Sequence, residues 1–183
     1  ERMVGDASSM WILTFHSACM RILRMEHIYT GYSSSFTVYD PQDQKAVVKR
    51  ILKEKNIDEK AISPAYILSV ISSCKGVDKS YEEWRDENMD LPHNEKVYEV
   101  AKEYDKVLKS NNSMDFDDLL LNTVRLFKEH KEVLMKYQSR FSYVTVDEYQ
   151  DTNFIQYMIV KMLSESHRNI CVVGDDDQSI YQW

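Results

Sequence analysis

Two short β-branched runs near the end of the chain place the strongest limits on its fold. The runs are 143–146 (Tyr-Val-Thr-Val) and 170–173 (Ile-Cys-Val-Val), and an apolar stretch with helical spacing, 154–163, separates them. A strand, a helix and a second strand in this order are typical of a buried parallel sheet. Each run leads into acidic residues, at 147–148 and 175–177. Because ligands of such sheets bind at the carboxyl ends of the strands, we expect a binding site where the two acidic clusters lie.

The middle of the chain, from about 31 to 114, predicts helices only. Asp40-Pro41 and Ser63-Pro64 each combine an N-cap residue with a first-turn proline, and apolar residues with helical spacing follow both pairs. We expect the second of these helices to end near Gly76 in a left-handed conformation. A polar, acidic loop is then expected to extend to about residue 93.

The rest of the chain supplies further helices and one more strand. Helical spacing resumes at Glu95 and ends at Asn111-Asn112. Asp115 can cap the next helix, and another helix reaches about Gln138. Near the start of the chain, the apolar run 10–15 predicts a strand that leads directly into an amphipathic helix. We therefore expect an α/β protein, mostly α by content, in which a large helical insertion interrupts a parallel sheet.

The strongest chemical signal is the segment 144–153, Val-Thr-Val-Asp-Glu-Tyr-Gln-Asp-Thr-Asn. Its apolar strand delivers two adjacent carboxylates to the strand tip, where Asp147 could hold Mg²⁺ through water and Glu148 could deprotonate an attacking water. A bare acidic pair could instead simply favour the start of a helix. The full string resembles the DExxQD box (motif II, or Walker B) of the UvrD/PcrA/Rep superfamily 1 DNA helicases, with ten consecutive residues in register.

A second string, 172–183 (Val-Val-Gly-Asp-Asp-Asp-Gln-Ser-Ile-Tyr-Gln-Trp), resembles motif III of the same family. The resemblance implies that Gln178 reads the γ-phosphate of ATP, while Tyr181 and Trp183 meet the bases of single-stranded DNA. A neutral amide can bind a phosphate oxygen, and aromatic rings stack on any base for roughly 1–3 kcal/mol each. The alternative interpretation places Ile180 and Tyr181 in a core and leaves Trp183 as a frayed chain end.

A third string begins with Thr14-Phe15-His16-Ser17 and continues to Arg21-Ile22-Leu23-Arg24. It is similar to motif Ib of these helicases, which contacts single-stranded DNA at a strand-to-helix turn. Thr14, His16 and Ser17 are therefore candidate DNA-binding residues. Hydroxyls, an imidazole and helix N–H groups suit phosphate oxygens at such a turn, although a lone histidine there more often caps or packs a helix.

The resemblance covers the whole chain and implies a fragment of an ATP-dependent DNA helicase. It implies a partial RecA-like (P-loop NTPase) 1A domain in residues 1–30 and 115–183, interrupted by a helical 1B-like subdomain in residues 31–114. The implied cofactors are ATP and Mg²⁺, and the implied partners are single-stranded DNA and its junctions with duplex. The implied activity is 3′ to 5′ movement along DNA with unwinding, in DNA repair or replication.

The phosphate loop of such an enzyme is not in this chain, since no GxxxxGK[ST] string occurs. The motif III string also stops at Trp183, where the family continues. We therefore expect the chain to be a piece of a longer enzyme and to be inactive by itself. The incomplete sheet is expected either to self-associate or to rearrange the chain ends over its exposed strands.

Two other classes of function remain open at this point. A metal-dependent nuclease or phosphohydrolase could use Asp147, Glu148, Asp175 and Asp177 as a two-metal carboxylate cluster. A non-catalytic helical interaction module would need none of these strings. The net charge of −7 argues weakly against nucleic acid overall, but it does not decide the charge of a local groove.

The cysteines and the apolar runs of the sequence also predict the cellular compartment of the protein. Cys19, Cys74 and Cys171 are far apart and odd in number, so they supply neither a disulfide framework nor a CxxC metal pair. No apolar run approaches the roughly 20 residues needed to span a bilayer. We expect a soluble cytoplasmic protein with no membrane partner.

Overall fold

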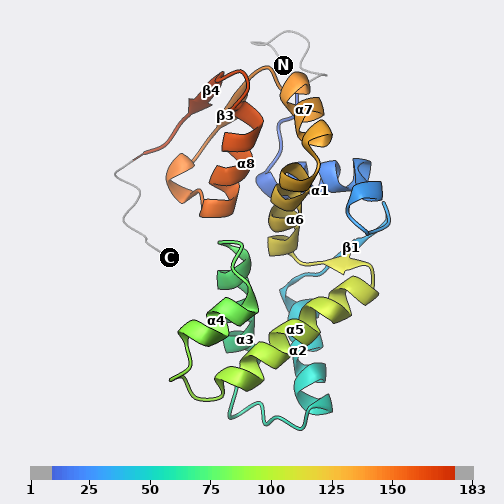
Figure 1. Ribbon diagram of the computed structural model, residues 1–183, viewed down its shortest axis with the longest axis vertical. Helices are drawn as coiled ribbons and strands as arrows, with labels where there is room; N and C mark the ends of the chain where they lie inside the picture. Colours follow the sequence, from blue (N-terminus) through green and yellow to red (C-terminus); the bar gives the residue numbers. More distant parts are fainter. Residues whose placement is uncertain (1–9, 176–183) are drawn as a thin grey trace.

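The computed structural model describes residues 10–175, which form a mixed α/β structure that is mostly helical. Two groups of elements, each around its own hydrophobic core, lie toward opposite ends of the long axis (Figure 1). We call the group that carries the paired strands β3 and β4 the sheet lobe, and the other the helical lobe. The expected α/β class is confirmed at this level.

The helical lobe is built from four helices that bury apolar side chains against one another. They are α2 (Pro41–Glu54), α3 (Pro64–Lys75), α4 (Tyr81–Glu87) and α5 (Asn94–Ser110). The predicted caps are confirmed: Asp40 accepts from the first-turn N–H groups of α2, and Ser63 does so for α3. Tyr104 of α5 has no exposed surface and belongs to this core.

Two predictions for this lobe are wrong. The segment after residue 78 is not only a loop, because Ser80 and Glu83 form a capping box that starts α4, and Tyr81 and Trp84 anchor that helix in the core. Gly76 is not left-handed: it has a φ of −63°, and the left-handed residue is Asp78, with a φ of 55°. Asp78 tolerates this conformation better than most residues, so the turn does not need the glycine.

The sheet lobe contains four helices and one described pair of longer strands. They are α1 (Phe15–Met25), α6 (Phe116–Glu129), α7 (Lys131–Arg140), α8 (Phe154–Ser164), β3 (Val144–Val146) and β4 (Ile170–Val172). Strands β3 and β4 are parallel, with Val144 opposite Ile170 and Val146 opposite Val172. The helix α8 connects them, as predicted.

The predicted strand at 10–15 is wrong in the described structure. Residues 10–14 lie outside any helix or strand, and α1 already begins at Phe15. A strand needs a hydrogen-bonding neighbour, and none of residues 10–175 pairs with this run. Instead, Trp11 packs edge-on against Phe141, with ring centroids 5.0 Å apart.

The chain passes between the two lobes through a short parallel ladder. Strand β1 (Thr37–Val38) leads toward the helical lobe, and β2 (Ser113–Met114) leads back from it. Thr37 pairs with Ser113 and Val38 with Met114, so the prediction of a purely helical middle misses these two-residue strands. The 3₁₀ turn η1 (His27–Tyr29) lies between α1 and β1. None of the described helices is long and apolar enough to cross a membrane.

Candidate nucleotide site and nucleic-acid interface

The carboxyl ends of β3 and β4 bring the pair Asp147–Glu148 near Asp175, which is the described residue of the second acidic cluster. Beyond the strands, the N–H of Val173 donates to the carbonyl of Val146 over 2.8 Å, and the N–H of Tyr149 donates to the carbonyl of Val173 over 2.9 Å. The backbone pairing therefore continues past both tips. It holds the turn at 147–151 beside the segment 173–175, as the parallel arrangement predicts.

Asp147 and Glu148 stand exposed on the β3 side of this edge. Glu148 has a left-handed backbone, with φ 50° and ψ 44°, and its N–H donates to Asp147 Oδ1 over 3.0 Å. A glutamate in this conformation stores backbone strain, which is concentrated at functional sites in proteins. The left-handed residue turns the chain sharply after β3, and the 3₁₀ turn η2 (Tyr149–Asp151) follows at once.

Gln150 joins the two strand tips, a role that the sequence analysis missed. Its Nε2 donates to Glu148 Oε2 over 2.7 Å, and its Oε1 accepts from the N–H of Asp175 over 3.2 Å. Gly174 makes room for this bridge, because a Cβ on Gly174 would lie 2.8 Å from Gln150 Oε1. The Gln-Asp pair of the motif and the glycine after β4 were the available signals, but their contact depends on the strand register.

The oxygen donors at this edge fit a hydrated Mg²⁺ better than a metal held by protein alone. Asp147 offers a carboxylate, and Mg²⁺ usually keeps several waters and is held by one or two carboxylates together with substrate phosphates. Within residues 10–175, no three His, Cys, Asp or Glu side chains gather as a metal cluster. The described residues therefore give no support to the two-metal nuclease alternative. Asp177 of that alternative lies outside them.

The candidate DNA-binding residues Thr14, His16 and Ser17 lie together at the start of α1. Thr14 is the N-cap: its Oγ1 accepts from the N–H of Ser17 over 3.3 Å and donates to Ser17 Oγ over 3.0 Å. Thr14 is exposed, while His16 and Ser17 are half-buried. An exposed helix start with a hydroxyl cap presents N–H groups that can bind phosphate oxygens.

His16 packs against the first turn of α6. Its ring meets Phe116 edge-on, with centroids 5.5 Å apart and an interplanar angle of 88°. This contact supports in part the alternative that His16 packs against a helix. The same contact places the half-buried imidazole beside the first residue of α6.

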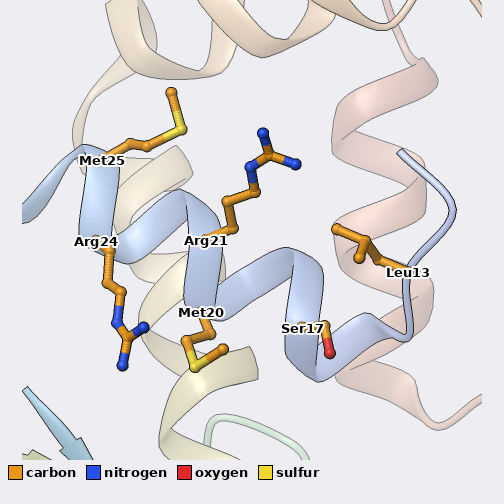
Figure 2. A pocket seen from close by; sticks show the side chains of 6 residues that line it. All are labelled: Leu13, Ser17, Met20, Arg21, Arg24 and Met25. Carbon is orange, nitrogen blue, oxygen red and sulfur yellow. The ribbon is translucent and has the colours of Figure 1, made fainter. Parts of the chain in front are cut away.

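The outer face of α1 carries two arginines that flank a shallow hollow of about 580 Å³ (Figure 2). Arg21 and Arg24 extend to opposite sides of the helix, with Met20 and Ser17 nearby. The Arg21 guanidinium lies 4.2 Å from the ring centroid of Trp11, and that of Arg24 lies 5.3 Å from Phe36. Among the described residues, neither arginine forms an ion pair. The ring contacts leave both charges available to an external anion.

The structure brings the site residues together as two groups within the sheet lobe. One comprises Asp147 and Glu148, and the other comprises Thr14, His16 and Ser17; no hydrogen bond of the described residues joins the groups. Gln178, Tyr181 and Trp183 lie outside the described residues, so their predicted roles are not placed.

The sheet lobe thus carries a parallel strand pair that is followed by two adjacent carboxylates, and it also carries a helix whose exposed start is capped by Thr14. The whole chain, residues 1–183, matches the family described as UvrD/REP helicase N-terminal domain, and the chain belongs to that family. It is 46% identical over 184 residues to the ATP-dependent DNA helicase PcrA of Staphylococcus epidermidis (strain ATCC 35984). It is 45% identical to the helicase of the same name from Staphylococcus aureus (strain Mu50). These alignments cover 100% of the chain and 25% of each relative, so the chain spans about a quarter of their length.

Proposed function

We propose that this chain is part of a longer ATP-dependent enzyme that moves 3′ to 5′ along single-stranded DNA and unwinds duplex at junctions. The observation that carries the proposal is the joining of the β3 and β4 tips by Gln150, which holds Glu148 beside Asp175. Such a joined edge can link a nucleotide site to the segment that follows β4. The relatives are named ATP-dependent DNA helicases, and this name supports ATP and DNA as ligands of the longer enzyme.

At the nucleotide site, Asp147 is the proposed Mg²⁺ ligand and Glu148 the proposed catalytic base. Bound Mg²⁺ would neutralise the developing charge on the transferred phosphoryl group. Glu148 would accept the proton of the attacking water, while Gln150 holds its carboxylate in a fixed direction. Gln178 is the proposed sensor of the γ-phosphate.

At the nucleic-acid interface, the proposed contacts of DNA phosphates are Thr14, His16 and Ser17. Tyr181 and Trp183 are the proposed stacking platforms for bases. The two arginines on α1 favour the same class of ligand, because neither pairs with an acidic side chain of residues 10–175 and such charges attract phosphates. In this proposal, residues 31–114 correspond to a 1B-like subdomain, and the flanking segments to a RecA-like 1A domain. The proposed setting is DNA repair or replication in the cytoplasm.

The proposal is tested with the longer protein that carries this chain. DNA-stimulated ATP hydrolysis and strand separation are measured for the wild type, Glu148→Gln and Trp183→Ala. Glu148→Gln keeps the shape but removes the base, so hydrolysis should be lost while nucleotide still binds. Trp183→Ala should retain basal hydrolysis and weaken its stimulation by DNA. Turnover near wild type in Glu148→Gln would show that the catalytic base is assigned wrongly.

A further inference from the structure

A buried lysine lies where the helical lobe meets the first turn of α6. Lys75 is the last residue of α3, and its side chain is only 4% exposed. Its Nζ lies 3.0 Å from Asp105, 2.9 Å from Asp115 and 2.7 Å from Asp118. Burial opposes the charge of Lys75, but the three carboxylates outweigh that effect and raise its pKa well above the usual value.

Two of these carboxylates form the capping box of α6 and bind Lys75 at the same time. Asp115 accepts from the N–H of Asp118 through Oδ1 and faces Lys75 with Oδ2. Asp118 accepts from the N–H of Asp115 through Oδ2 and faces Lys75 with Oδ1. The inner oxygens shape the helix start, and the outer oxygens attach it to α3. The ammonium group of Lys75 therefore joins both carboxylates of this turn to the helical lobe, and the hydroxyl of Tyr104 adds a second bond to Asp115 over 3.1 Å.

The remaining residues of that turn also make contacts across it. Asp117 is half-buried, and this burial raises the pKa of its carboxyl, while the hydroxyl of Ser72 on α3 acts in the opposite direction. Phe116 meets the ring of His16 on α1. The turn 116–118 thus touches α3 on one side and the start of α1 on the other.

We infer that Lys75 is a positioning residue for the nucleic-acid contact: it holds the first turn of α6 so that Phe116 sets the orientation of His16. The functional consequence rests on the proposed function of His16, whereas the structural relationship does not. Loss of Lys75 leaves buried carboxylates without their cation, and the turn moves to expose them. The Phe116 ring then moves relative to His16. Through Lys75 the helical lobe in this way influences the DNA contact, although Lys75 itself does not touch DNA.

The structural step is tested by NMR of the His16 ring in the 183-residue chain. Lys75→Met and Asp118→Asn should each shift the ring resonances of His16, because the Phe116 ring changes place. Asp105→Asn is the matched control: it removes another carboxylate partner of the same lysine, but Asp105 lies on α5 within the helical lobe. Phe116→Leu calibrates the size of the effect. Asp118→Asn keeps a capping side chain, so the test stands even if Lys75→Met does not fold.

Unchanged His16 resonances in Asp118→Asn, with a clear change in Phe116→Leu, would overturn the inference. An equal change in Asp105→Asn would also overturn it, since the effect would then not require a carboxylate of the first turn of α6.

The functional step is tested in the longer protein by the affinity for a single-stranded oligonucleotide. Asp118→Asn is expected to weaken binding about fivefold or more, a typical size for coupling between sites, while Asp105→Asn leaves it within twofold. Normal DNA affinity in Asp118→Asn, despite shifted His16 resonances, overturns the functional step. His16→Ala separates the two ideas: if it leaves affinity unchanged, the proposed DNA contact of His16 fails, while the positioning of the ring by Lys75 stands on the NMR result.

Discussion

The side-chain amide of Gln150 donates a 2.7 Å hydrogen bond to the carboxylate of Glu148, two residues earlier in the turn after β3. The other end of the same amide accepts from the backbone of Asp175, beyond β4. A side-chain amide suits this arrangement, because its NH₂ group donates while its carbonyl oxygen accepts. Glutamate or leucine at this position would break at least one of the two bonds.

We predict that Gln150→Leu, in the longer protein, lowers the rate of ATP hydrolysis at least tenfold and changes nucleotide affinity much less. The reason is that the carboxylate of Glu148 loses the group that orients it, and misplaced catalytic groups are costly. The measurement is kcat and KM for ATP with saturating single-stranded DNA. Gln138→Leu is the matched control, because Gln138 bonds the carbonyl of Met162 away from the site. Equal rates in wild type and Gln150→Leu would contradict the orienting role.

The 183-residue chain alone is expected to hydrolyse ATP at a negligible rate. Glu148 and Asp147 are present, but no GxxxxGK[ST] loop occurs in the chain to hold the triphosphate beside them. Phosphate release should be measured with Mg²⁺ and single-stranded DNA, with Glu148→Gln as the background control. DNA-stimulated turnover of about 1 s⁻¹ or more, a normal rate for an enzyme, would refute this prediction.

The stability of the chain is expected to fall as the pH rises from about 5 to 7. Burial raises the pKa of Asp118 from 3.8 to about 7, with the Asp115 and Asp105 charges acting in the same direction and Lys75 opposing them. In this pH range the folded chain therefore keeps a proton on Asp118 that the unfolded chain releases. The stabilisation that this proton gives at low pH is lost as the pH rises toward 7. The slope for one such group is at most roughly 1.4 kcal/mol per pH unit.

Denaturant unfolding at several pH values tests this expectation. Asp118→Asn should flatten the pH dependence, and Asp86→Asn, an exposed aspartate on α4, should leave it unchanged. Some slope should remain in Asp118→Asn, because the pKa of Asp117 is also raised. Parallel curves for the wild type and Asp118→Asn would mean that Asp118 does not carry the proton.

Self-association through the β3–β4 pair is a further expectation for the isolated chain. Within the described residues this sheet has two strands, and Ile170, Val172 and Val173 are exposed. An open edge with apolar side chains favours pairing with another strand. Light scattering should show mass increasing with concentration, and Val172→Lys should reduce it. Ile28→Lys is the control, since Ile28 is also exposed but lies in η1.

Amide exchange distinguishes the possible outcomes for these strands. Slow exchange in β3 and β4 that depends on concentration would confirm pairing between copies. A monomer at high concentration whose strands exchange slowly, with no rearranged chain end over them, would contradict the prediction. The helices of the helical lobe should exchange slowly in either case, because their caps and apolar faces lie within one lobe.

The sequence predicts the parts of this fold whose signals are local. Capping residues such as Asp40 and Asp115 indicate where helices begin, and the β-branched runs at β3 and β4 indicate a parallel pair of strands. The helix α4 could have been predicted from Ser80 and Glu83, but their acidic surroundings favoured a loop. Strands β1 and β2 could not have been predicted in this way, since a strand of two residues carries no periodic pattern.

The candidate site follows the same division. Asp147 and Glu148 are recognisable because the chemistry lies in adjacent residues. The bridge from Gln150 to Asp175 and the contacts of Lys75 join residues 25 to 43 positions apart, by difference of the residue numbers. Such contacts depend on strand register and on how two helix ends meet, so only the three-dimensional structure reveals them.

The two-residue ladder between β1 and β2 has a consequence for how such a protein can change over evolution. Because Thr37 pairs with Ser113, the chain enters and leaves the helical lobe at adjacent positions, roughly 5 Å apart as in any sheet. Insertions are tolerated where their two ends lie close together. Lengthening, trimming or replacing the segment 39–112 therefore leaves the path of the sheet lobe intact. The condition is that the residues of this segment that pair with Asp115 and Asp118 are either kept or lost together with those two aspartates. The helical lobe is an exchangeable module whose fit to its host depends on the buried Lys75 and on the ion pairs of Asp78 with Arg125 and Lys128.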